Sequence, residues 1–192
     1  VHPHESEQMT DDDIERLSRM TEDKKVVAIG EIGLDYHYDF SPRDIQKKRF
    51  AQQMELARKL ALPVIIHERE AHADCLDIVR GFKEVKGVYH CYSGSLEMAK
   101  ELISLGYYIS FTGSVTFKNA RRAPEIIQWM PKDRYMIETD SPYLTPEPFR
   151  GRRNDPAKVR YVAEKIAEIR GETVEAVAYQ TLENGKQFFG IG

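Results

Sequence analysis

Residues Val26–Asp35 read V-V-A-I-G-E-I-G-L-D, an apolar run that passes through a glycine into the carboxylate of Glu31. Continuous apolar runs of this kind are typical of parallel strands that are covered on both faces of a sheet. An ionisable side chain at the end of such a strand is costly to bury unless it is paired or binds a metal ion. We therefore predict a strand over Val26–Glu31 and a functional position for Glu31.

Three later segments repeat this pattern of an apolar run that ends in a polar residue. They read P-V-I-I-H, G-V-Y-H and Y-M-I-E-T-D, at Pro63–His67, Gly87–His90 and Tyr135–Asp140. Segments with helical periodicity separate them, and a further strand is expected at Tyr107–Phe111. Repeated strand–helix alternation predicts an α/β fold with a parallel sheet and right-handed crossovers.

Two α/β architectures fit this alternation, an open doubly wound sheet and a TIM-type (β/α) barrel. In a barrel the C-terminal ends of several strands converge on one axis, whereas an open sheet brings such ends together mainly at its switch point. Because four of the predicted strands end in metal-ligating residue types, the barrel is favoured, as a single domain over residues 1–192. Five strands do not close an eight-stranded barrel, and the chain opens on V-H-P-H, so we expect its N-terminal part to be missing.

The composition restricts the classes of function. A net charge of -3 does not indicate nucleic-acid binding by itself, so such a function needs a local basic patch. No run approaches the roughly 18 apolar residues of a membrane span, and no signal-peptide pattern is present. Cys75 and Cys91 have neither disulfide nor zinc-finger spacing. These features predict a cytoplasmic protein with no membrane association and no obligate protein partner.

Each polar strand end also has an ordinary structural explanation. Glu31 can be a loop acid, His67 and His90 can be hydrogen-bonded core histidines, and Asp140 can cap the following Ser-Pro turn. These explanations require four coincidences at the same structural position, so a shared site is favoured. Two histidines and two carboxylates suit one or two divalent metal ions, with Mg, Mn and Zn all compatible. Glu31 can bridge two ions, and Asp140 can take the proton of an attacking water.

Four motifs resemble those of the TatD-family metal-dependent deoxyribonucleases of the amidohydrolase superfamily. They are G-E-I-G-L-D-Y, P-V-I-I-H-x-R, H-C-Y-S-G and E-T-D-S-P-Y-L, at Gly30–Tyr36, Pro63–Arg69, His90–Gly94 and Glu138–Leu144. The resemblance implies a TIM-type barrel and metal-dependent hydrolysis of DNA, often from a strand end. It also implies metal ligation by Glu31, His67 and His90, and a combined role as ligand and general base for Asp140.

Further candidates for substrate binding lie outside these four positions. The opening V-H-P-H is similar to the family segment at the end of the third barrel strand, which would turn His2 toward the site. The usual H-x-H ligands of the family belong to an earlier strand, so neither His2 nor His4 is assigned as a ligand. Arginine pairs well with phosphate, and the remaining candidates are Arg69, Arg152, Arg153 and Asn154. Solvated or salt-bridged arginines are the alternative.

The resemblance favours a 3′–5′ exodeoxyribonuclease that acts on single-stranded DNA. Another hydrolase reaction at the same site, such as removal of a D-amino acid from tRNA, is the alternative among enzymes, because the ligand set fits both. A scaffold-like protein with an impaired site is the alternative outside enzymes. The metal content of the purified protein separates this last possibility from the other two.

Overall fold

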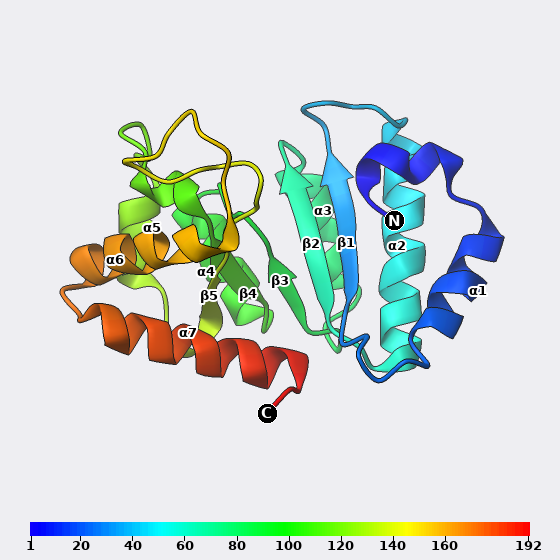
Figure 1. Ribbon diagram of the computed structural model, residues 1–192. Helices are drawn as coiled ribbons and strands as arrows, with labels where there is room; N and C mark the ends of the chain where they lie inside the picture. Colours follow the sequence, from blue (N-terminus) through cyan, green and yellow to red (C-terminus); the bar gives the residue numbers. More distant parts are fainter. The chain divides into compact units, whose positions relative to one another are not determined.

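The computed structural model describes residues 1–192, and the chain forms two compact units. The first unit comprises Val1–His90 together with Ser104–Tyr107. The second comprises Cys91–Ile103 together with Tyr108–Gly192. Each unit has its own parallel strands and its own covering helices (Figure 1). The expectation of a single domain over residues 1–192 stays a prediction.

Three parallel strands run through the first unit. β1 (Ile29–Asp35) pairs with β2 (Val64–Arg69), and β2 pairs with β3 (Gly87–Tyr89). The helices of this unit are η1 (Pro3–Gln8), α1 (Asp11–Met20), α2 (Arg43–Leu60) and α3 (His72–Arg80). α2 packs on β1 and on η1, with α1 on its other side (Figure 1). The short η1 is thereby held near the first strand.

The second unit contains β4 (Tyr108–Phe111) and β5 (Tyr135–Ile137), which pair in parallel. Its helices are α4 (Leu96–Ser104), η2 (Gly113–Thr116), α5 (Ala123–Trp129), η3 (Lys132–Arg134), η4 (Pro156–Lys158), α6 (Val159–Arg170) and α7 (Val174–Phe189). α6 and α7 pack on each other (Figure 1). The Asn184 amide donates to the carbonyl oxygens of Lys132 and Tyr135, each at 2.7 Å, which fastens α7 to the beginning of β5.

The thiols and the helices add two further findings. Neither cysteine forms a disulfide, and the Sγ of buried Cys75 lies 3.3 Å from the Tyr89 hydroxyl. Burial raises the pKa of the Cys75 thiol, which therefore stays protonated at neutral pH. No helix combines the length and the apolarity that crossing a bilayer requires.

The bounds of the first strand correct the prediction from sequence. The predicted strand ended at Glu31, whereas β1 begins at Ile29 and continues to Asp35. Its pairing with β2 shifts register between Ile29 and Ile32, so that Glu31 is exposed while the residues after it are buried. Pairing with β2 therefore determines where β1 begins and ends. The apolar run alone does not predict these bounds.

The later strands also differ in length from their predictions. β2 continues beyond His67 to Arg69, where it still pairs with Asp35. β5 ends at Ile137, so Asp140 lies in the loop that follows the strand and has a positive φ of 55°. The histidine of β2 is thus held by strand pairing, whereas the aspartate after β5 is held by its loop.

Gly33 permits the close approach of β1 to β2. Its φ of +139° is a conformation that side-chain-bearing residues rarely adopt, and a Cβ at this position would lie 1.9 Å from the carbonyl oxygen of His67. A larger residue would therefore push β1 away from the strand that carries His67.

We expect Gly33→Ala to lower the free energy of unfolding by about 3 kcal/mol, because it combines backbone strain with a clash against a neighbouring strand. Chemical denaturation followed by circular dichroism measures the change. Gly185→Ala in α7 is the matched control, since its Cβ would meet nothing closer than Met136 Sδ at 3.9 Å. It should raise stability by up to about 1 kcal/mol through helix propensity. Equal effects of the two substitutions would contradict this account of Gly33.

Candidate metal centre

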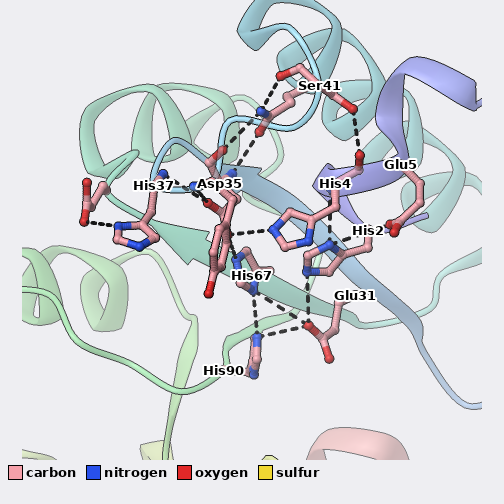
Figure 2. Close-up of polar contacts among 12 residues, drawn as sticks. His2, His4, Glu5, Glu31, Asp35, His37, Ser41, His67 and His90 are labelled. Carbon is pink, nitrogen blue, oxygen red and sulfur yellow. Dashed lines mark hydrogen bonds and ion pairs between the residues drawn. The ribbon is translucent and has the colours of Figure 1, made fainter. Parts of the chain in front are cut away.

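Three polar side chains from the strands of the first unit, or from directly after them, meet in one cluster (Figure 2). Glu31 comes from β1, His67 from β2, and His90 directly follows β3. Glu31 Oε2 lies 3.1 Å from His90 Nε2 and 3.8 Å from His67 Nδ1. The two histidine nitrogens are 3.2 Å apart. Strand pairing thus brings together three of the four residues that the sequence predicted as metal ligands.

These separations fit a common divalent ion. Ligand atoms bound at about 2.1 Å to a tetrahedral zinc ion lie about 3.4 Å from one another. The measured distances of 3.1–3.8 Å among Glu31, His67 and His90 bracket that value. The hydrogen bond from His90 lowers the pKa of Glu31 to about 2 although burial opposes this, so the carboxylate is ionised at neutral pH. Both the spacing and the charge of this cluster suit a cation.

Asp35, which was not among the predicted site residues, contacts His67 through the ring nitrogen that faces away from Glu31 and His90 (Figure 2). Its side chain is 0% exposed. Oδ2 lies 3.0 Å from His4 Nε2 and 2.9 Å from His67 Nε2. Oδ1 accepts hydrogen bonds from the backbone amides of His37 and Tyr38. Burial by itself would raise the pKa of Asp35, but the hydrogen bonds from Tyr38, His4 and His67 lower it to about 2.

The contact with Asp35 determines which nitrogen of His67 faces the cluster. An ionised carboxylate only accepts hydrogen bonds, so His67 donates its Nε2 proton to Asp35. Burial lowers the pKa of His67, and the neutral ring carries a single proton. Nδ1 therefore keeps a lone pair that points toward Glu31 and His90. A histidine whose second nitrogen donates to a carboxylate is the common arrangement among metal ligands.

His2 faces the same cluster through a protonated nitrogen. Its Nδ1 accepts a hydrogen bond from the His4 amide at 3.2 Å, which leaves the proton of the neutral ring on Nε2. That atom lies 3.8 Å from Glu31 Oε2. Burial, followed by repulsion from His67 and His4, lowers the pKa of His2 to about 4. The structure thus places His2 beside the site as a hydrogen-bond donor, and its contact with substrate stays a prediction.

A second group of possible ligands, the nitrogens of His2, His4 and His67, also lies within 4.8 Å of one another. Asp35 already accepts from the Nε2 atoms of His4 and His67, and His2 Nδ1 accepts from a backbone amide. These nitrogens therefore already take part in hydrogen bonds that stabilise the fold. The Glu31, His67 and His90 group is therefore the better candidate for ion binding.

The remaining predicted residues are spread over both units. Arg69 ends β2, and its guanidinium carbon lies 4.8 Å from the centroid of the Tyr38 ring. Arg152 and Arg153 are exposed in the loop of the second unit. Their contact with phosphate stays a prediction.

Asn154 has contacts that differ from the expected phosphate contact. Its side chain is only 4% exposed, and its amide group donates to the carbonyl oxygens of Thr139 and Tyr143 at 2.8 and 2.7 Å. These two residues flank Asp140, so Asn154 holds the loop that carries the predicted base. A pattern of polar residues in a loop does not distinguish this supporting role from substrate binding.

The family profile described as "TatD related DNase" matches residues 1–190 of the chain. The chain is 48% identical over 192 residues to the uncharacterized metal-dependent hydrolase YabD of Bacillus subtilis (strain 168), covering 99% of this chain and 75% of that protein. It is 36% identical over 199 residues to the 3′-5′ ssDNA/RNA exonuclease TatD of Citrobacter koseri, covering 100% of this chain and 76% of that protein.

Solved structures of TatD-family proteins are similar to this chain in fold. The crystal structure of YJJV, a TatD homolog from Escherichia coli K12, superposes with a TM-score of 0.92 at 31% identity, covering 100% of this chain and 75% of that one. A TatD-family hydrolase from Entamoeba histolytica superposes with a TM-score of 0.87 at 24% identity, covering 98% and 72%. These likenesses confirm the predicted α/β class and the TIM-type barrel fold.

The ionised Asp35 leads to a prediction for the metal-free protein. Because its pKa is about 2 in the folded state and near 3.9 in an unfolded chain, Asp35 contributes stability above about pH 4, and this contribution is lost as the pH falls toward 2. Asp35→Asn should therefore lower the free energy of unfolding at pH 7 by about 2 kcal/mol. The difference from wild type should shrink between about pH 4 and pH 2.

Denaturant titrations in the presence of a chelator measure this difference at each pH. Asp39→Asn is the matched control, since Asp39 is a partly exposed carboxylate that pairs with Arg43 on the surface. It should change stability by less than about 1 kcal/mol. A destabilisation by Asp35→Asn that stays constant from pH 7 to pH 2 would show that the charge of Asp35 is not its source.

Proposed function

This chain belongs to the TatD-related DNase family of metal-dependent hydrolases, and from that premise we propose that it removes nucleotides from the 3′ end of single-stranded DNA. The observation that carries the proposal is the group of donor atoms on Glu31, His67 and His90 at ion-binding separations. A relative named as a 3′-5′ ssDNA/RNA exonuclease supports the choice of substrate.

The proposed ligands are Glu31 through Oε2, His67 through Nδ1 and His90 through Nε2. Asp140 is proposed as a further ligand from its place in the E-T-D-S-P-Y-L motif. A divalent ion held there, whether Mg, Mn or Zn, would supply a water molecule of lowered pKa and neutralise charge on the phosphate. Were a second ion bound, Glu31 would help to hold it.

Protein side chains carry out the proton transfer and bind the phosphates. Asp140 accepts the proton of the attacking water, because an ionised carboxylate is a competent general base at neutral pH. His2 donates its Nε2 proton in a hydrogen bond to a phosphate oxygen, since its other nitrogen is occupied by the His4 amide. Arg69, Arg152 and Arg153 pair with phosphates of the bound strand and do not take part in proton transfer.

The ligand assignment predicts that His90→Ala loses metal affinity before it loses the fold. Removal of a ligand should raise the dissociation constant for Mn²⁺ or Zn²⁺ by at least about 100-fold, judged against the 10- to 100-fold typical of residues that only support ligands. Isothermal titration calorimetry on chelator-treated protein measures the constant, and circular dichroism checks the fold. His72→Ala is the matched control, because His72 pairs with Glu68 through Nδ1 away from the cluster. Unchanged affinity in folded His90→Ala would refute the assignment.

Asp140→Asn should lower the rate of single-stranded DNA cleavage by about 10²- to 10⁴-fold, because an amide cannot accept the proton of water. Release of 3′-terminal nucleotides from a labelled oligonucleotide measures the rate. Asp133→Asn, an exposed carboxylate in η3, is the control and should leave the rate unchanged. D-aminoacyl-tRNA is assayed in parallel. Faster turnover of this ester than of DNA would replace the nuclease proposal by deacylation.

A further inference from the structure

A pocket of about 370 Å³ opens in the second unit, formed by residues other than the proposed metal ligands. Its walls come from the loop after β3, the end of β4, η2 and the beginning of α5. Its lining includes three aromatic rings, two arginines and three neutral polar side chains: Tyr92, Phe111, Phe117, Arg121, Arg122, Ser93, Ser114 and Asn119. We propose that this pocket binds one unpaired nucleobase of the DNA strand, an inference that rests on the proposed nuclease function.

The apolar part of the pocket is held in place before a ligand arrives. Phe111 and Ile126 are almost fully buried. Tyr92 is 8% exposed, and its hydroxyl donates to the Ser95 carbonyl at 2.7 Å. A Cβ on Gly94 would lie 2.5 Å from that hydroxyl, so the glycine allows the tyrosine to cross its own loop. These buried side chains shape the floor, and the half-buried ring of Phe117 offers an aromatic face on which a flat base can stack whatever its identity.

The rim of the pocket is positively charged. Arg121 and Arg122 are exposed, and no acidic side chain lines the cavity. The guanidinium carbon of Arg150 lies 3.7 Å from the centroid of the Phe117 ring, which adds a third cation beside the pocket. A nucleotide presents an apolar ring and an anionic phosphate within one residue. The pocket offers the complementary pair, an apolar floor and a cationic rim.

Hydrogen bonds within the second unit connect this pocket to the proposed base. Glu138 accepts from the Cys91 amide at 2.8 Å and from the Ser110 hydroxyl. Cys91 and Ser110 directly precede Tyr92 and Phe111, and the Tyr92 amide donates to the Ser110 carbonyl at 3.0 Å. Glu138 also lies two residues before Asp140 along the chain. The segment that presents Asp140 and the floor of the pocket are therefore fixed to each other.

A base bound in this pocket should contribute to cleavage of the strand that carries it. The substrates are a short oligothymidylate and a set of oligonucleotides with a single abasic residue at each successive position from the 3′ end. Wild-type protein loaded with Mn²⁺ should lose about 5- to 150-fold in kcat/KM when the abasic residue occupies one particular position. Abasic residues further along the strand should have little effect.

Two variants change the pocket in different ways. Ala120→Trp places a bulky ring into the cavity, so intact and abasic substrates should be cleaved at equally reduced rates. Arg121→Ala combined with Arg122→Ala changes only exposed side chains, and should raise KM and reduce the salt dependence of binding by about 0.7 in log–log slope per arginine. Arg16→Ala with Arg19→Ala on α1 removes the same charge elsewhere and should change neither quantity.

A small phosphodiester without a neighbouring base, bis(p-nitrophenyl) phosphate, distinguishes this proposal from the proposed function. All pocket variants should hydrolyse it as fast as wild type. If the wild-type protein hydrolyses neither this ester nor DNA, the nuclease function itself is refuted. If wild type cleaves DNA but no abasic position matters, or if Ala120→Trp keeps the position-dependent loss, the pocket does not bind a base.

Discussion

The buried carboxylate of Asp35 connects most of the elements that form the candidate metal centre. Its side chain contacts His4 of η1 and His67 of β2, and it also accepts amide protons from the loop that follows β1. Its backbone is fixed as well, because Gln46 of α2 accepts from the Asp35 amide at 2.8 Å and donates to the Asp35 carbonyl at 3.1 Å. A fully buried charge is tolerated only with such complete hydrogen bonding. Asp35 thus fixes the positions of α2, η1, β1 and β2 relative to one another.

Much of this centre could be predicted because its residues follow apolar runs. His67 and His90 come directly after buried strand residues, so strand pairing alone carries them to the same edge. Glu31 was recognised from the same signal although it lies within β1, since the exposed part of that strand follows its first apolar run. The α/β class followed from the strand–helix alternation, which is a local property of the sequence, and the barrel followed from the metal-ligating residue types at four predicted strand ends.

Asp35 and His4 could not be predicted in the same way. Asp35 follows the alternating segment I-G-L, which resembles the beginning of a loop, and its importance arises from partners on η1 and β2. His4 is attached to a proline-containing turn whose position depends on packing against α2. The sequence offered one signal for Asp35, an acidic residue directly after a leucine. Leu34 is buried in the structure, and a charge beside a buried residue needs partners. The supporting contacts of Asn154 could not be predicted for the related reason that its partners are backbone carbonyls, which no sequence pattern marks.

The hydrogen bond from His67 to Asp35 also affects which ions the proposed centre can discriminate. Because Asp35 fixes the orientation of this ring and strand pairing fixes its backbone, the conformational entropy of collecting the ligands is lost during folding and not during binding. A preorganised frame with ligand separations of 3.1–3.8 Å resists expansion. Calcium prefers six to eight oxygen ligands at about 2.3–2.6 Å, whereas two of the three proposed ligands here are imidazole nitrogens. We therefore expect these preorganised nitrogen and carboxylate donors to favour ions that accept imidazole ligands, such as zinc and manganese, over calcium.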